Sequence, residues 1–132
     1  MERREYSDFR SLLAYSKSFE LAMDIFNISK LFPKEEKYSL TDQIRRSSRS
    51  VSANLAEGYK KRIYPALFLL KMTDCLGENS ETQVWLEFAF HCNYIENEKY
   101  QEMYKKNDEI GKLLLYMYNN PEKFGVVKKL IS

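Results

Sequence analysis

Apolar residues recur at steps of three and four along almost the whole chain, which is the period of an α-helix. The three prolines stand where these periodic runs stop. Proline is tolerated in the first turn of a helix and biases the residue before it away from helical geometry, so each proline marks a boundary. The pattern predicts helices at about 9–32, 39–61, 65–92 and 97–119, followed by a basic tail at 121–132.

The composition favours a single compact domain that covers residues 1–132. Hydrophobic residues make up 44% of the chain, and only four glycines and three prolines interrupt the helical pattern. No segment shows the alternating pattern of a strand. Four amphipathic helices joined by short connections predict an all-α fold, the antiparallel up-down four-helix bundle.

The predicted helix at 39–61 carries an apolar stripe and a basic face. At about 100° per residue, its apolar residues fall within one arc of roughly 60°, which we expect to face the core. These residues are Leu40, Ile44, Val51 and Leu55. Most of its basic residues lie on a different side, and Lys60 extends the face that the arginines form. Ser39 or Thr41 is expected to cap the N-terminus of the helix.

Basic residues are concentrated in and just after this helix, although the whole chain has a net charge of only +2. Between residues 43 and 62 the single acidic residue is Glu57. Arginine side chains bind phosphate oxygens through two parallel hydrogen bonds and do not need to contact the bases. We therefore expect a phosphate-binding surface. The candidate nucleic-acid-binding residues are Arg45, Arg46, Arg49, Lys60, Lys61 and Arg62.

Several features of this region leave alternatives open. The basic face is either a phosphate site, a solvated surface, or a set of arginines that pair with carboxylates of a neighbouring subunit. A run of small polar residues either allows another helix to approach closely or is simply exposed. This run comprises Ser47, Ser48, Ser50, Ser52 and Asn54.

Two further expectations concern the end of the same helix. Glu57 is placed to form an ion pair with Lys60 or Lys61 within the helix. Tyr59 and Tyr64 are candidates for stacking on bases, because they lie beside the basic residues.

No pattern in the chain predicts catalysis, so we expect no enzymatic activity, cofactor, metal or small-molecule substrate. The single histidine excludes a di-iron bundle, which needs a Glu-x-x-His motif on each of two helices. Cys75 and Cys92 are about 25 Å apart along one predicted helix and are expected to be half-buried thiols without a disulfide. No apolar run approaches the roughly 20 residues of a membrane span, which favours a cytoplasmic protein without membrane contact.

Three sequence motifs occur together in a fixed order. They are Phe32-Pro33 with Glu36 and the run from Tyr38 to Ser47, then Asn54-Leu55-Ala56-Glu57-Gly58, and finally Ser80-Glu81-Thr82-Gln83-Val84-Trp85-Leu86. In these motifs and their spacing, the chain resembles the four-helix-bundle proteins encoded by intervening sequences within bacterial 23S rRNA genes. The resemblance covers roughly residues 9 to 117.

This resemblance implies a homopentamer of up-down bundles with no known enzymatic activity. One related branch, the accessory proteins of diversity-generating retroelements, forms a basic pentamer that binds nucleic acid and a reverse transcriptase. The hallmark motif of the family matches Arg45 and Arg46 together with Asn54, Glu57 and Gly58. We interpret the last three as structural or interface residues.

Our leading hypothesis is a cytoplasmic homopentameric scaffold that binds structured RNA or a nucleoprotein partner through the basic face of the helix at 39–61. The alternative is a protein-protein assembly module in which Arg45, Arg46 and Arg49 lie in subunit interfaces.

Overall fold

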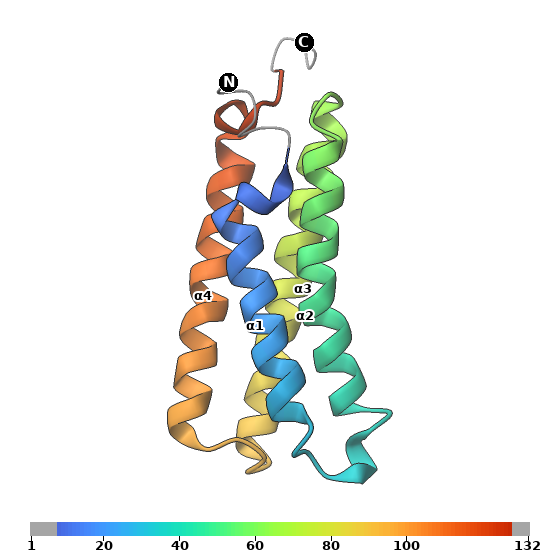
Figure 1. The fold of residues 1–132 in the computed structure, drawn as a ribbon, viewed down its shortest axis with the longest axis vertical. Coiled ribbons are helices and arrows are strands. Elements are labelled where there is room, and N and C mark those ends of the chain that lie inside the picture. The colour runs from blue at the N-terminus through green and yellow to red at the C-terminus, as the bar shows by residue number, and fades with distance from the viewer. Residues whose placement is uncertain (1–7, 128–132) are drawn as a thin grey trace.

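The computed structural model describes residues 8–127, and these form four long helices that lie side by side and alternate in direction (Figure 1). The helices are α1 (Leu13–Ser29), α2 (Leu40–Lys60), α3 (Pro65–His91) and α4 (Asn97–Asn119). Short 3-10 turns precede or follow them: η2 (Phe9–Ser11), η3 (Lys34–Glu36) and η4 (Pro121–Phe124). The prediction of an all-α chain with four helices is confirmed, and no strand occurs within the described residues.

The first helix is shorter than the predicted 9–32. Leu12 adopts an extended backbone (φ −76°, ψ 132°), which separates η2 from α1 and buries the Leu12 side chain. At the other end the chain leaves the helix before Pro33, because a residue that precedes proline disfavours helical geometry. The basic tail predicted at 121–132 begins as η4, and its last part, 128–132, lies outside the described residues.

The predicted core stripe of α2 is buried. Ile44 and Leu55 have no exposed surface, while Leu40 and Val51 are 7% and 2% exposed. Helix α3 supplies the opposite side of the core with Phe68, Met72 and other buried residues. The periodicity of the sequence therefore located the buried side of α2 correctly.

Small polar residues allow α2 to pack closely against its neighbours. Ser47, Ser48 and Ser52 are buried. The Thr82 hydroxyl on α3 donates to Ser47 Oγ at 2.8 Å, and the hydroxyls of Ser18 on α1 and Ser52 are 2.9 Å apart. For these serines the structure supports close helix approach over simple exposure.

The N-terminus of α2 is capped by Glu36 rather than by Ser39 or Thr41. Glu36 Oε1 accepts from the Ser39 hydroxyl at 2.7 Å and from the Leu40 backbone N–H at 3.2 Å. Glu36 Oε2 accepts from the Tyr94 hydroxyl at 2.8 Å. These hydrogen bonds lower the pKa of Glu36, and the same carboxylate raises the pKa of Tyr94 to about 12. The carboxylate thus ties the α1–α2 connection to the α3–α4 connection.

The two cysteines occupy different environments. Cys75 is fully buried in the core, its thiol donates to the Val51 carbonyl at 3.5 Å, and burial raises its pKa to about 12. Cys92 is exposed and follows the last residue of α3, so the prediction of two half-buried thiols in one helix is wrong. Both are free thiols. None of the helices in residues 8–127 is long and apolar enough to cross a membrane.

Candidate nucleic-acid interface

The six candidate cations of α2 and the residues after it divide into three groups. Arg45 and Arg49 point toward α1, Arg46 contacts α3, and Lys60, Lys61 and Arg62 lie at the far end of the helix. These three groups have different neighbours: an aromatic ring, two carboxylates, and backbone carbonyls.

Three cations gather around the ring of Phe26 on α1. Lys30 Nζ, Arg45 Cζ and Arg49 Cζ lie 4.7, 4.9 and 5.6 Å from the ring centroid. Arg45 is held in place, because its Nε donates to Ser29 Oγ at 2.7 Å and its Nη2 donates to the Phe26 carbonyl at 3.4 Å. We call Lys30, Arg45 and Arg49 the Phe26 cluster.

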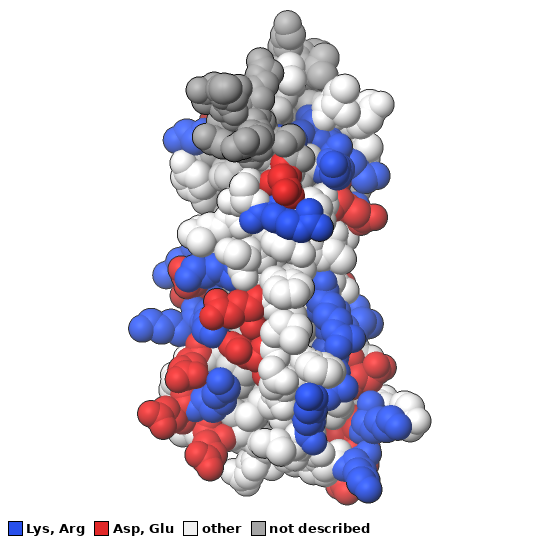
Figure 2. All heavy atoms as spheres, in the orientation of Figure 1, with Lys and Arg blue, Asp and Glu red and all other residues white. Residues whose placement is uncertain are grey.

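The Phe26 cluster contains like charges without an opposing one. Across residues 8–127, no carboxylate oxygen lies within 4.0 Å of a charged nitrogen of Lys30, Arg45 or Arg49. The nearby acids of α1 are engaged elsewhere, since Glu20 and Asp24 pair with Lys106 on α4 at 3.3 and 2.6 Å. Figure 2 shows this face: acidic and basic side chains alternate toward α4, mostly basic ones lie toward α2, and an uncharged strip separates the two sides.

The surface beside the cluster is an open groove of about 540 Å³ along α2. Arg45 and Arg49 line it together with Lys37 and Tyr38 from the connection that precedes the helix. The one carboxylate in the lining belongs to Asp42. A groove with this charge suits an extended anion better than an apolar ligand.

Arg46 belongs to the contact between α2 and α3. Its Nη2 lies 2.6 Å from Glu81 Oε2 and its Nη1 lies 3.5 Å from Glu78 Oε1. The hydrogen bond to Glu81 raises the pKa of Arg46, and the Trp85 indole N–H donates to the same carboxylate oxygen at 3.1 Å. Although Arg46 also borders the groove, its charge is compensated within the chain.

The motif Asn54, Glu57 and Gly58 surrounds one residue of α3, Lys71. Lys71 Nζ donates to Glu57 Oε1 at 2.8 Å and to Asn54 Oδ1 at 3.2 Å. A Cβ atom on Gly58 would lie 2.9 Å from Lys71 Cβ, so only glycine allows the helices to approach this closely. Asn54 is oriented by its own hydrogen bond to the Ser50 carbonyl at 2.9 Å.

This arrangement corrects one prediction and explains the motif. The ion pair expected between Glu57 and Lys60 or Lys61 is wrong, because the partner of Glu57 is Lys71 on α3. That contact lowers the pKa of Glu57 and raises the pKa of Lys71. We call Asn54, Glu57, Gly58 and Lys71 the Lys71 clamp, and its role is to fix α3 against α2.

The far end of α2 is separate from the Phe26 cluster. Lys60 follows Arg49 by eleven residues, about 16 Å along the helix axis, and the alanines at 53 and 56 lie between them on that face. Arg62 is partly buried, which lowers its pKa, and it donates to the carbonyls of Tyr59 and Phe124 at 2.7 and 3.2 Å. Eleven residues are about three helical turns, so Lys60 lies on the same face of α2 as Arg49 but beyond the groove that Arg45 and Arg49 line. That Lys60 extends the arginine surface stays a prediction.

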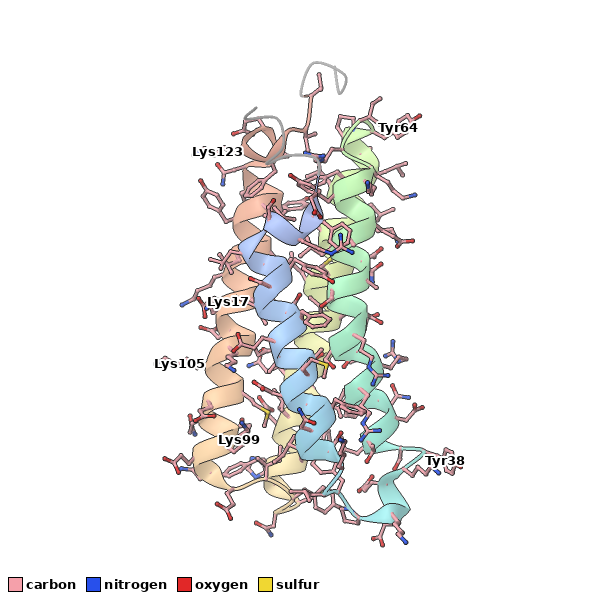
Figure 3. All side chains as sticks on the ribbon, viewed as in Figure 1. Lys17, Tyr38, Tyr64, Lys99, Lys105 and Lys123 are labelled. Carbon is pink, nitrogen blue, oxygen red and sulfur yellow. The ribbon has the colours of Figure 1, made fainter. Side chains whose placement is uncertain are left out.

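The two tyrosines predicted to stack on bases differ in exposure. Tyr59 is 1% exposed, with the Arg62 guanidinium 3.6 Å from its ring centroid, so the prediction that it contacts bases is wrong. Tyr64 is 60% exposed but lies at the end of the bundle opposite Tyr38 (Figure 3). In residues 8–127, no three His, Cys, Asp or Glu side chains come together in a way that could hold a metal ion.

Comparison with known proteins places the chain in a family. The family model described as 23S rRNA-intervening sequence protein matches residues 10–116. A crystal structure of a protein of unknown function from the S23 ribosomal protein family of Bacteroides thetaiotaomicron is similar, with a TM-score of 0.74 and 33% sequence identity. The match covers 81% of this chain and 96% of that one. A comparison with curated proteins found no match. The chain belongs to the 23S rRNA-intervening sequence protein family.

Proposed function

We propose that this member of the 23S rRNA-intervening sequence protein family is a non-enzymatic, cytoplasmic, oligomeric scaffold that binds the phosphate backbone of structured RNA. The observation that carries the proposal is the Phe26 cluster, in which three cations share one aromatic ring without a carboxylate partner in the described part of the chain.

The arrangement favours a polyanion for a physical reason. Like charges that lie this close repel one another, and a phosphate backbone supplies the compensating negative charge. The two hydrogen bonds of Arg45 hold its guanidinium at the surface before any ligand arrives, so less side-chain entropy is lost on binding. The groove next to the cluster gives the backbone a path along α2.

Self-association is supported by the outer side of α3. Leu67 and Leu70 near the start of α3, and Val84 and Phe88 near its end, lie on that side, and each is between 41% and 56% exposed. Large apolar side chains exposed together on one side of a helix are typical of a surface that another protein chain covers. Together with the family resemblance, this supports a homopentamer, in which the Phe26 cluster of every subunit would contribute to avidity.

The alternative function is an assembly module that binds no nucleic acid. It would use Arg45 and Arg49 in contacts with carboxylates of a neighbouring subunit. Arg46 needs no such partner, because Glu78 and Glu81 of its own chain compensate its charge.

The deciding experiment measures RNA affinity by fluorescence anisotropy across a salt series. Each phosphate contact contributes roughly 0.7 to 0.9 to the slope of log K against log salt concentration. The double variant Arg45→Gln with Arg49→Gln should therefore flatten the slope by about 1.4 to 1.8 for each bound subunit. Arg46→Gln is the matched control and should leave the slope unchanged, since that guanidinium is already paired.

A single variant and a measurement of the oligomeric state complete the test. Arg49→Gln alone removes a cation that makes no hydrogen bond within the described residues, so loss of binding in this variant is not a folding defect. Mass photometry of the same samples should give about five times 15.8 kDa. If the assembly dissociates in the double variant while wild-type protein binds no RNA, the assembly module is the correct function.

A further inference from the structure

Tyr38 is the most exposed aromatic side chain of the described residues. It is 84% exposed, although burial of a tyrosine is normally favourable. It stands in the short connection between η3 and α2 and projects from the bundle (Figure 3). No core contact accounts for an aromatic residue at this position.

The backbone on both sides of Tyr38 is fixed. The Lys37 N–H donates to the Lys34 carbonyl at 3.1 Å, and the Ser39 N–H donates to the Glu36 carbonyl at 3.0 Å. The Ser39 hydroxyl is also held by the Glu36 carboxylate. A rigid backbone that presents an exposed ring is suited to binding, because little backbone entropy is lost when a ligand covers the ring.

Tyr38 shares its groove with the Phe26 cluster. Arg45 and Arg49 line the same groove, and Lys37 Nζ lies 5.3 Å from the centroid of the Tyr38 ring. An aromatic ring at the end of a cationic groove is the combination that single-stranded nucleic acids require: the cations bind the backbone and the ring stacks on a base. A double-helical backbone would use the cations alone, since its bases are already stacked.

We propose that Tyr38 is a stacking platform for an unpaired base of RNA, whose neighbouring phosphates lie along Arg45 and Arg49. This inference rests on the proposed function and narrows it, because the preferred ligand becomes a loop, a bulge or a single-stranded end. Stacking on the ring should depend little on the RNA sequence, because every base offers an aromatic face.

Tyr64 offers a matched control on the same molecule. It is also strongly exposed, at 60%, and it also precedes a long helix, but it lies at the opposite end of the bundle (Figure 3). Substitution of either ring removes a similar exposed surface. A difference between the two variants therefore reports the position of the ring and not a general effect of losing a tyrosine.

The test compares a single-stranded RNA that carries 2-aminopurine with a blunt RNA duplex of the same length. Binding of wild-type protein should quench the 2-aminopurine fluorescence of the single strand. Tyr38→Ala should bind the single strand about tenfold more weakly, abolish the quenching, and bind the duplex as wild type does. Tyr38→Phe and Tyr64→Ala should both behave as wild type.

The outcomes separate this inference from the function on which it rests. If wild-type protein binds neither RNA, the proposed function fails. If it binds both and Tyr38→Ala binds both as tightly as wild type, the stacking platform is wrong while the phosphate site stands. Equal weakening of both ligands, or an effect of Tyr64→Ala in place of Tyr38→Ala, also overturns the assignment of Tyr38.

Discussion

The two sides of α2 carry the same kinds of charge in opposite states of pairing. Toward α3, Arg46 contacts two glutamates, and Lys71 is held by Glu57 and Asn54. Toward α1, the Phe26 cluster contacts an aromatic ring, a hydroxyl and a carbonyl. The pairing of a cation on α2 is therefore decided by the helix beside it, because α3 supplies carboxylates at that contact and α1 does not.

Ion pairs are not the main source of stability in the contact between α2 and α3. The side chains of Arg46 and Glu57 are 46% and 59% exposed, and ion pairs in such settings typically contribute less than about 1 kcal/mol. Buried apolar surface and close helix approach contribute more. The ion pairs of the α2–α3 contact therefore fix its geometry, while the core supplies most of its stability.

The largest effect is expected from a substitution in the core, which stabilises both the α1 and the α3 contacts of α2. Leu55 has no exposed surface, so Leu55→Ala leaves a cavity and should lower the free energy of unfolding by about 2 to 5 kcal/mol. Urea denaturation measures the change. Leu31→Ala is the matched control, because Leu31 is 77% exposed, and its effect should stay within about 0.5 kcal/mol. A loss in Leu55→Ala as small as in the control would place the core on another side of α2.

An intermediate effect is expected from two glycines that differ only in what lies nearby. A Cβ atom on Gly58 would meet Lys71 Cβ at 2.9 Å, and that atom cannot move without its backbone. Gly58→Ala should therefore lower the free energy of unfolding by about 1 to 2 kcal/mol despite the better helix propensity of alanine.

Gly77 is the control for this substitution. Nothing lies within 4 Å of a Cβ atom built there, so Gly77→Ala should raise the free energy of unfolding by about 0.5 to 1 kcal/mol. Thermal melting of both variants shows directly whether each substitution stabilises or destabilises the protein. Stabilisation in both would show that α2 and α3 can separate slightly at no cost, and the Lys71 clamp would lose its explanation.

The sequence predicted those features that depend on local periodicity. The boundaries near Pro33, Pro65 and Pro121 and the buried stripe of α2 follow from helix geometry alone. The burial of Tyr59 also follows from this spacing, because Tyr59 follows Leu55 by four residues and so continues the buried stripe.

Contacts between residues far apart in the sequence do not follow from local periodicity. Lys71 is 14 residues from Glu57, and Glu81 is 35 residues from Arg46, so no helical spacing connects them. Phe26 belongs to an apolar run and gave no indication that cations surround it. Tyr38 lies in a connection, where periodicity says nothing about exposure. Sequence reasoning therefore identified the basic face but not which of its members are paired.

The smallest expected effect is the acid sensitivity of the paired side. The Lys71 ammonium keeps the pKa of Glu57 below its ordinary value of 4.5. A carboxyl group whose pKa is lowered by folding contributes stability above the pKa of the unfolded chain and loses it as the pH falls through the folded pKa. Glu57→Gln should therefore be slightly less stable than wild type at pH 7, and the difference should vanish as the pH falls from about 5 to about 3.

Arg49→Gln provides the contrast from the other side of α2. The Phe26 cluster contains no carboxylate, so this variant should follow the pH dependence of the wild type throughout the same range. Urea is the denaturant of choice, because the salt introduced by guanidinium would screen the ion pair. If the deficit of Glu57→Gln is the same at pH 7 and at pH 3, the Glu57 carboxylate is not what holds Lys71. Asn54 and the close contact at Gly58 would then be sufficient to fix α3, and the only charges of α2 paired with α3 would be those of Arg46.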